Sequence, residues 1–484
     1  MENDNTLHIG SRRELLVDDF LIDRLDNARL VLHHPQPAGT ALRFDRPWEG
    51  AFSGYCTVMK DGNRVLLCYR GWPAANKENH RDAVTCVATS ADGRTFERPD
   101  LGLYEVHGTK RNNVILTCDE DMYTHNFAPF IDSRPGVTAD EKFKALTRNY
   151  GLAFLSERDD VMGLVPFASP DGIRWRRLSD APIITQGKFD SQNVAFWSEH
   201  EQRYVCYLRE TAGGDNYATG VRSVARCTSE DFLHWTPPRL MDMGDAPLDQ
   251  LYTNQTHPYF RAPHIYIALP GRFMPGRQVL SRHEGERFGV HSKPGGKGGY
   301  WEDCSDAVLL TSRGGLRYDR TFMEAFIRPG LDRRNWTSRC NYPAQGTLQT
   351  GDTEMSLYVT RHNAQDGKYI ERLRLRLDGF ASLASGYDGG EMITRPLTFQ
   401  GSRLELNYST SAAGSIAIEI QSPDGQAVPG FALADSDPLI GDEIARTVTW
   451  KGAPNVGDLA ARPVRLRFRL KDADLFSLRF HPHP

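Results

Sequence analysis

The chain has 484 residues, enough for about three domains of ordinary size, with 39% hydrophobic and 25% charged residues. This composition is typical of a globular protein and excludes disorder as the main state. Lys and Arg number 58 against 62 Asp and Glu, which gives a net charge of −4. The sequence lacks the excess of Lys and Arg residues that binds the phosphates of nucleic acids, so no nucleic-acid partner is expected.

The same sequence argues against a membrane partner and against secretion. No apolar run approaches the ~20 residues that cross a bilayer. Residues 1–22 are acidic and polar where a secretory leader would be basic and then apolar, so a cytoplasmic protein is expected. The eight cysteines are scattered without a C-x-x-C pair, which predicts reduced core residues and no metal site.

In chain order, the first predicted element is an N-terminal strand or brace over residues 12–25. A hairpin motif then recurs five times: a strand ends in Ser, an Asp-Gly-like turn follows, and an aromatic residue closes it. Asp-Gly favours a tight turn between antiparallel strands because Gly reaches positive φ without strain. The turns lie 60 to 84 residues apart, at Asp92, Asp171, Asp231, Gly315 and, most weakly, Gly379.

Upstream of each turn, a polar loop leads into one strand and then a second. The five units begin at Gly54, Asn126, Asn193, Thr256 and Glu354. Five such units predict a five-bladed β-propeller, each unit being longer than a minimal blade because of long loops. An irregular set of β-sandwiches is the alternative, since turn signals alone do not establish closure.

After Gly389-Gly390 the pattern changes to about seven short strands between residues 397 and 480. The predicted fold is therefore all-β, a five-bladed β-propeller with its N-terminal brace over residues 1–388, followed by a C-terminal β-sandwich over 389–484.

In a propeller, polar residues just before each inner strand converge on a central funnel. The candidates, in chain order, are Asp45 and Glu49, His125 and Asn126, Asp190, Gln192 and Asn193, Asn254 and Gln255, and Asp352 and Glu354. Aromatic residues accompany them: Trp48, Tyr55, Phe127, Trp197 and Tyr252. Carboxylates, amides and aromatic faces together indicate a carbohydrate site, in which paired acids cleave a glycosidic bond.

Glu324 is a further candidate acid, in the segment Thr321-Phe-Met-Glu-Ala-Phe-Ile. We expect its apolar neighbours to desolvate the carboxyl and raise its pKa, as a general acid near neutral pH requires. Any one of these acids is as readily explained by a capped turn or a surface ion pair.

The five units, the Ser-x-Asp-Gly-x-x-Trp hairpins and the motifs Phe189-Asp-Ser-Gln-Asn and Phe322-Met-Glu-Ala-Phe resemble the five-bladed propeller glycoside hydrolases of families 32, 43, 62, 68 and 130, most closely the family 32-like group. The resemblance covers nearly the whole chain and implies a glycosidase acting on a small carbohydrate, with a furanoside favoured. The chain departs from it in blade two, where His125-Asn126 stands in place of an acid, and it lacks the Trp-x-Asn-Asp-Pro-Asn-Gly, Arg-Asp-Pro and Glu-Cys-Pro motifs.

The predicted roles follow. Glu324 is the proton donor, Asp190 the nucleophile or water-activating base, and Glu49 a third acid, while Arg313 is an additional substrate-binding candidate. No cofactor is expected, with a structural ion in the channel as the alternative, and a homo-oligomer is left open.

Three other functions stay open. One is a sialidase with an arginine clamp, and another is a carbohydrate-binding propeller without catalysis. The third is a phosphorylase, which needs a basic cluster near the acids, with Arg261, Arg313 and Arg328 as the residues available.

Overall fold

The computed structural model describes residues 6–73, 82–118, 123–149, 162–214 and 219–481. The chain divides into two units. The propeller unit is Pro35–Arg374, and the terminal unit combines Met1–His34 with Leu375–Pro484.

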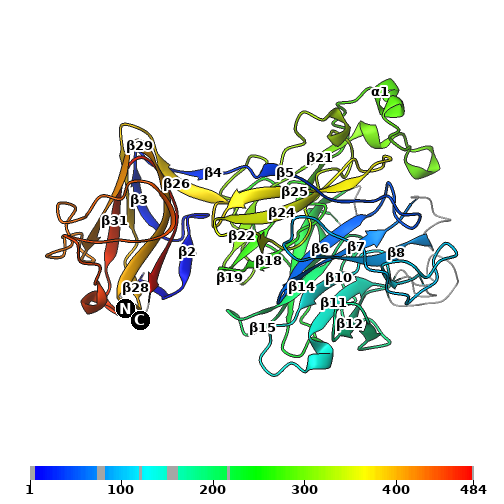
Figure 1. Cartoon of the computed structure of the whole chain (residues 1–484), viewed down its shortest axis with the longest axis horizontal. Coiled ribbons are helices and arrows are strands. Elements are labelled where there is room, and N and C mark those ends of the chain that lie inside the picture. The colour runs from blue at the N-terminus through cyan, green and yellow to red at the C-terminus, as the bar shows by residue number, and fades with distance from the viewer. Residues whose placement is uncertain (1–5, 74–81, 119–122, 150–161, 215–218, 482–484) are drawn as a thin grey trace. The chain divides into compact units, whose positions relative to one another are not determined.

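The five blades of the propeller unit are antiparallel sheets that follow one another along the chain (Figure 1). Each sheet is one blade, and its strands follow one another from the ring axis outward. Blade one contains β6 (Gly54–Asp61), β7 (Arg64–Gly71), β8 (Val84–Ser90) and β9 (Val114–Leu116). Blade two contains β10 (Ala128–Ile131), β11 (Phe143–Arg148), β12 (Leu164–Ser169) and β13 (Arg176–Arg177), with the short 3-10 turn η2 (Ala139–Glu141). Blade three contains β14 (Val194–Ser198), β15 (Arg203–Ala212), β16 (Val221–Ser229) and β17 (Arg239–Leu240).

Blade four is shorter and blade five is completed from the N-terminal part of the chain. Blade four contains β18 (His257–Tyr259), β19 (Ala262–Ala268) and β22 (Leu310–Ser312). Blade five contains β23 (Leu348–Gln349), β24 (Glu354–Arg361), β25 (Tyr369–Arg376) and, as its outermost strand, β5 (Gln36–Arg43). Because β5 precedes blade one in sequence and pairs antiparallel with β25, it closes the ring and covers a sheet edge that would otherwise be open.

The inner strands of neighbouring blades touch, which places them around a common axis. β6 contacts β10, β10 contacts β14, and β14 contacts β18. Blades five and one meet at a parallel bridge between Gln345 and Thr57. The predicted five-bladed β-propeller is confirmed, and its closure comes from these contacts and from β5.

Apolar residues fill the space between blades. Leu66, Cys68 and Val87 of blade one pack with Phe143 of blade two in one buried cluster. A sheet covered on both faces reads as a nearly continuous apolar run, as in Val65-Leu-Leu-Cys-Tyr of β7. All eight cysteines are free thiols, and seven of them are buried.

The repeated hairpins share one hydrogen-bond pattern in the first three blades. The Oγ of Ser90, Ser169 and Ser229 each accepts from the backbone N–H three residues later at 2.9 Å. In the third copy that residue is Phe232, which adopts the same left-handed φ of 74° as Gly172. These turns follow the third strand of each blade, so they lie at the opposite end of the ring from the starts of the inner strands, and they are structural.

Residues 275–303 form an excursion between the two strands of a ribbon at blade four, β20 (Gly271–Met274) and β21 (Cys304–Ala307). The excursion contains helix α1 (Arg282–Arg287), which begins at a capping box made by Ser281 and Glu284, and the 3-10 turns η4 (Pro294–Gly296) and η5 (Tyr300–Glu302). Another 3-10 turn, η6 (Arg333–Asn335), lies in the segment that leads from blade four to blade five.

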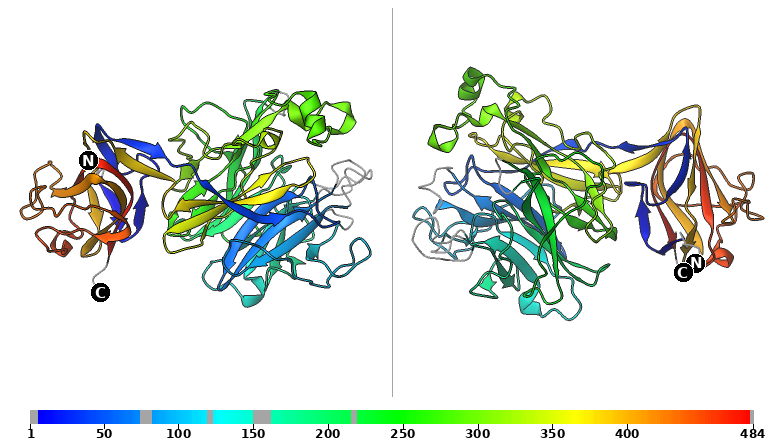
Figure 2. Two further views of the ribbon diagram at one scale, coloured as in Figure 1. Left: turned by 45° about the horizontal axis from the view of Figure 1, so that its top comes forward. Right: turned by 180° about the vertical axis from the view of Figure 1, so that it is seen from behind.

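The terminal unit interleaves strands from both ends of the chain, so that blue and red strands lie together in Figure 2. Its largest sheet is built on the long strands β29 (Arg403–Gln421) and β31 (Arg465–His481), which pair antiparallel. β2 (Arg13–Leu15), β26 (Ala381–Ser385) and β27 (Gly390–Thr394) pair with β31. The remaining strands are β3 (Ile22–Asp26), β4 (Arg29–Leu32), β30 (Asp442–Thr447), and the parallel pair β1 (Leu7–Gly10) and β28 (Leu397–Phe399), with the 3-10 turn η7 (Gly457–Leu459).

The unit boundaries and the strand order of blade five differ from what the sequence predicted. Residues 1–34 and 375–388, assigned there to the propeller, belong to the compact terminal unit, because β2, β3 and β4 pair with its strands. In blade five, Glu354 begins the second strand, not the inner one, because β23 precedes it and pairs with it. Within the described residues, no helix has the length and apolar character to span a bilayer.

Candidate functional site

A pocket of about 370 Å³ opens among residues at the starts of the inner strands and the ends of the second strands. All five blades contribute to it, and so does the excursion. Its lining includes Phe52, Tyr55, Arg70 and Trp72 of blade one, His125 of blade two, Asp190 of blade three, Tyr252 and Gln255 of blade four, Arg339, Tyr342, Asn363 and Lys368 of blade five, and Tyr300 of the excursion. A pocket built from every blade lies on the ring axis, where side chains distant in sequence meet.

The backbone is unusual where the chain enters the inner strands. Tyr55, Phe189, Gln255 and Asn341 adopt left-handed φ values of 50°, 48°, 51° and 65°. This conformation is uncommon for residues other than Gly, and it recurs here in four of the five blades. The kinks turn these segments toward the axis and deliver Tyr55, Asp190 and Gln255 to the pocket.

Asp190 is the one carboxylate among the described lining residues. Its Oδ1 accepts a hydrogen bond from Nη1 of Arg209 at 3.0 Å, and its side chain is 29% exposed. Arg209 is buried at the end of β15 and lies over the Tyr252 ring at 4.5 Å. Asp190 therefore has a held orientation and still faces the pocket.

Buried amides hold the loop that carries Asp190. Asn126 Nδ2 donates to the carbonyls of Phe189 and Ser191 at 2.7 Å each, and Asn193 Nδ2 donates to Ser191 at 2.8 Å. Asn126 was predicted to bind substrate, but its side chain is buried and its bonds connect blade two to this loop. It is a positioning residue for Asp190.

Three cationic side chains share the pocket with Asp190. The Arg70 guanidinium lies over the rings of Tyr55 and Trp72, at 4.5 and 4.8 Å, and donates to the Phe52 carbonyl at 2.8 Å. Arg339 lies over the rings of Tyr252 and Tyr300, at 5.3 Å from each.

The third cation, Lys368, is buried, and its Nζ donates to Oδ1 of Asn363 at 2.6 Å. Burial, reinforced by repulsion from Arg70, lowers the pKa of Lys368 to about 7. The ammonium of Lys368 thus loses its proton within the physiological range.

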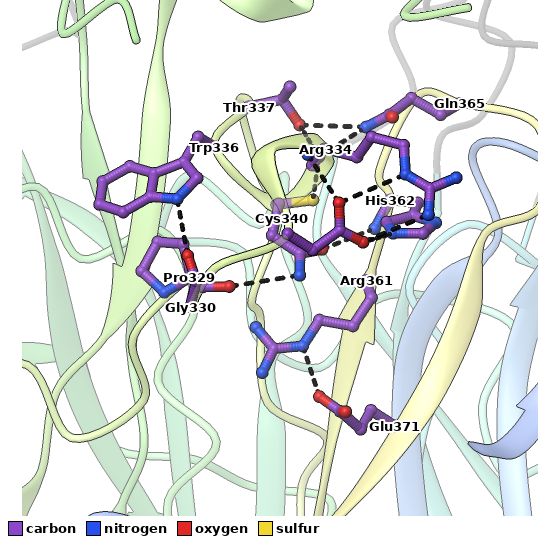
Figure 3. Close-up of polar contacts among 12 residues, drawn as sticks. Pro329, Gly330, Arg334, Trp336, Thr337, Cys340, Arg361, His362, Gln365 and Glu371 are labelled. Carbon is purple, nitrogen blue, oxygen red and sulfur yellow. Dashed lines mark hydrogen bonds and ion pairs between the residues drawn. The ribbon is translucent and has the colours of Figure 1, made fainter. Parts of the chain in front are cut away.

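The segment that brings Arg339 and Tyr342 to the pocket is anchored to the loop between β24 and β25 by contacts drawn in Figure 3. His362 Nε2 bonds Oδ2 of Asp332 at 2.7 Å, and Gln365 Nε2 donates to the Arg334 carbonyl at 2.8 Å. Trp336 Nε1 donates to the Gly330 carbonyl at 2.9 Å. Arg339 itself has a left-handed φ of 60°, so its position is imposed by the surrounding structure.

Of the predicted site residues, the structure brings Asp190, His125 and Gln255 to the pocket, together with the predicted aromatic residues Tyr55 and Tyr252. The other amides are buried and bonded inside the fold. Gln192 bonds Thr57 and Gln255, Asn193 bonds the Asp190 loop, and Asn254 donates to the Tyr207 carbonyl at 3.3 Å. They hold the ring together and lie outside the pocket lining.

The acids predicted in blade one also lie outside it. Glu49 is buried, accepts from Tyr69 OH at 2.5 Å, and pairs with Arg98 at 2.7 Å. Trp48 is buried in the core and donates to Asn113 at 3.0 Å, and Asp45 is exposed beside Arg98. Glu49 and Arg98 thus form a buried ion pair in blade one.

The predicted environment of Glu324 is wrong. Phe322 and Phe326 are buried, but Glu324 between them is exposed, lies outside any strand, and is not in the pocket lining. The backbone here is irregular, so the two phenylalanines turn inward and the residues between them turn to solvent. The paired carboxylates expected from the sequence are therefore not brought together.

Glu354 and Arg313 are likewise outside the lining. Glu354 pairs with Arg372 and with Arg94, which belongs to the first Ser-Asp-Gly turn, so it lies at the far end of the ring. Asp352 precedes it in the same turn. Arg313 lies in the turn after β22, also away from the pocket.

Arg70, Lys368 and Arg339 line the pocket but were not predicted from the sequence. One signal could have revealed the first. Arginines recur at the ends of second strands, as Arg70, Arg148, Arg209 and Arg361, and in an antiparallel blade the second strand ends where the inner strand begins. Arg339 and Lys368 follow no such repeat, because they come from loops specific to blade five. Among the described residues, no cluster of three or more His, Cys, Asp or Glu is arranged to hold a metal ion.

No protein-family model matches the chain, and no curated protein matches it. Solved structures with a similar fold include one described as a glycoside hydrolase, with 10% identity, TM-score 0.48, and coverage of 70% of this chain and 92% of that one. Another is a glycosyl hydrolase from Bacteroides ovatus, with 14% identity, TM-score 0.39, and coverage of 75% and 96%. A third is an N-acetylgalactosamine deacetylase from F. plautii in complex with blood group B trisaccharide, with 12% identity, TM-score 0.43, and coverage of 73% and 97%. Because these sequence identities are so low, the chemistry of this chain has to be inferred from the residues of its own pocket.

Proposed function

We propose that this chain is a carbohydrate-active enzyme that cleaves a glycosidic bond of an oligosaccharide or glycoside in the axial pocket. One observation carries the proposal: the Asp190 carboxylate is held at fixed orientation in a pocket lined with aromatic rings. Tyr55, Trp72, Tyr252 and Tyr300 offer flat faces to a sugar ring. Asp190 faces the same space and is the group that would act at the anomeric carbon or at the leaving oxygen.

Hydrolysis with Asp190 as nucleophile or water-activating base is the first form of this proposal. This reaction needs a second group that protonates the leaving oxygen. Glu324 was predicted to be that group, but it lies outside the pocket lining. A furanoside such as a fructoside or arabinoside heads the substrates to test, because the sequence resembles propellers that act on furanosides.

Phosphorolysis is the second form, favoured by the cations that surround Asp190. In that reaction an oxygen of dihydrogen phosphate bonds to the anomeric carbon while the bond to the leaving oxygen breaks, and a proton of the phosphate passes through the Asp190 carboxylate to that oxygen. One carboxylate is then enough, since phosphate brings the nucleophile and Arg70, Arg339 and Lys368 would hold its charge.

The test is a panel of aryl glycosides and oligosaccharides, including fructosides and arabinosides, with and without phosphate, read out as free sugar and sugar phosphate. Asp190→Asn is expected to lower turnover by about 10²-fold or more. Asp45→Asn and Glu324→Gln, which alter exposed carboxylates outside the pocket, are expected to retain turnover. Normal turnover in Asp190→Asn would refute the assigned role.

A wild-type protein that binds sugars but cleaves no compound on the panel would refute the proposed enzymatic activity. It would support a carbohydrate-binding propeller without catalysis.

A further inference from the structure

Among the described residues that line the pocket, three are cations and one is a carboxylate, a ratio that the chain as a whole does not share. Arg70, Arg339 and Lys368 line it together with Asp190. The net charge of the entire sequence is −4, so the cluster does not reflect a basic composition. Asp190 is moreover engaged by a fourth cation, Arg209, at 3.0 Å.

The cations are close enough to repel one another. Both arginines act electrostatically on Lys368, and each opposes its protonation. Like charges in a confined space raise the free energy of the empty site, and a bound anion would relieve the repulsion. Among the described residues, no carboxylate lies within 4.0 Å of the Arg339 guanidinium or of Lys368 Nζ.

The cations are also held ready for a ligand. The Arg339 guanidinium is placed over the rings of Tyr252 and Tyr300, and its backbone is in a left-handed conformation. Lys368 is fixed by the side chain of Asn363. Beside them, Gln255 is 1% exposed and its Oε1 accepts no hydrogen bond from the part of the chain that the structure describes, so it is an open acceptor for a sugar hydroxyl.

We propose that Arg70, Arg339 and Lys368 form an oxyanion subsite, and that the sugar bound in this pocket carries or is accompanied by an oxyanion. The proposal rests on the proposed function for its sugar. A planar guanidinium matches two oxygens of a carboxylate or phosphate, and the ammonium of Lys368 adds a third donor group. Two sources share this chemistry: the carboxylate of a uronic acid residue, and inorganic phosphate.

The subsite is tested by calorimetric binding to the full-length protein, without turnover. The probes are methyl glucuronide, methyl galacturonide, their neutral counterparts methyl glucoside and methyl galactoside, and inorganic phosphate. At least one uronate is expected to bind at least about tenfold more tightly than its neutral counterpart, or phosphate is expected to bind and to strengthen the binding of a neutral sugar. The first outcome assigns the oxyanion to the sugar, and the second assigns it to phosphate.

Arg339→Gln is the main variant, because the Arg339 side chain contacts rings and forms no ion pair with the described residues, so its loss should leave the fold intact. It is expected to weaken the anionic probe at least about tenfold and the neutral sugars less than twofold. The matched control is Arg111→Gln, which removes the same charge from an arginine 87% exposed on the surface. Lys368→Met, with its thermal unfolding checked, is the second variant and should weaken the same probe.

Equal binding of anionic and neutral sugars together with no effect of phosphate would overturn the subsite. So would an anion affinity unchanged in both Arg339→Gln and Lys368→Met. If an anion binds as expected but no glycoside is cleaved, the proposed function fails and the subsite stands. If glycosides are cleaved and the anion effects are missing, the subsite alone fails.

Discussion

Gln255 Nε2 donates to Oε1 of Gln192 at 2.9 Å, and this bond joins the entrances of the inner strands of blades four and three. Gln192 Nε2 then donates to Oγ1 of Thr57 in blade one at 2.8 Å, and Thr57 donates to Gln345 in blade five at 3.3 Å. Blades three and one are not neighbours in the ring, so the chain of bonds crosses its middle. Of the amides expected to bind sugar, Gln192 instead joins the blades, while Gln255 both joins them and lines the pocket.

Removing the middle of this chain should destabilise the propeller. Gln192→Ala leaves the bonding groups of Thr57 and Gln255 without their partner in a buried site, which costs about 1–3 kcal/mol. Urea unfolding measures the loss, and Gln349→Ala, at an exposed position of β23, is the control. A Gln192→Ala protein of unchanged stability but weaker sugar binding would instead support the role predicted from sequence.

Substitution of Glu49 tests whether this acid is structural or catalytic. Glu49→Gln leaves the Arg98 guanidinium with a weaker partner in a buried site and should lower the free energy of unfolding by about 3 kcal/mol. Turnover at temperatures where the variant is fully folded should stay unchanged. Glu97→Gln, at an exposed position nearby, is the control. Lost turnover with unchanged stability would restore Glu49 to the catalytic set.

Lys368 should make the binding of an anion depend on pH. Burial and then Arg70 lower the pKa of Lys368 to about 7, so the ammonium is mostly protonated below this pH and mostly neutral above it. Affinity for a uronate, whose own charge is constant in this range, is expected to fall between about pH 6 and about pH 8.5.

Two further readouts test this prediction. Proton uptake on binding at about pH 7.5 appears as a dependence of the binding heat on the buffer. Lys368→Met should abolish both the uptake and the pH dependence. An uptake that persists in the variant would assign the titration to another lining group, such as His125.

His257 should lower stability in mild acid. It is buried in β18, donates through Nδ1 to the Gln255 carbonyl at 2.8 Å, and burial lowers its pKa to about 4. The unfolded chain binds this proton near pH 6.5, so the free energy of unfolding falls as the pH drops from about 6.5 to about 4. From pH 6.5 to pH 5 the contribution of His257 is roughly 2 kcal/mol.

Urea unfolding at the two pH values measures this contribution. His257→Asn should show a loss smaller by that amount, and His200→Asn, at an exposed position, should behave like the wild type. Equal losses in wild type and His257→Asn would contradict the buried neutral histidine.

The blades and their turns were readable from sequence because they are local. Ser90-Ala-Asp-Gly and Ser169-Pro-Asp-Gly specify turns by their own side-chain bonds, and Asp231-Phe232 keeps the same geometry without the glycine. The sequence also located the loop of Asp190, because it immediately precedes an inner strand. The register of blade five was misread by one strand, because β23 is two residues long and too short to leave a pattern.

The sequence by itself determined an all-β chain, five repeated blades, and one acid of the pocket, because strand periodicity and turn chemistry act over a few residues. Only the tertiary structure decided that β5 closes the ring and that residues 1–34 join the terminal unit, since both depend on pairing between distant segments. It also decided which polar residues face the pocket and which are buried between blades. Glu49 and Glu324 were both predicted to be catalytic acids, and the difference between a buried ion pair and an exposed carboxylate arises from neighbours that the chain supplies from elsewhere.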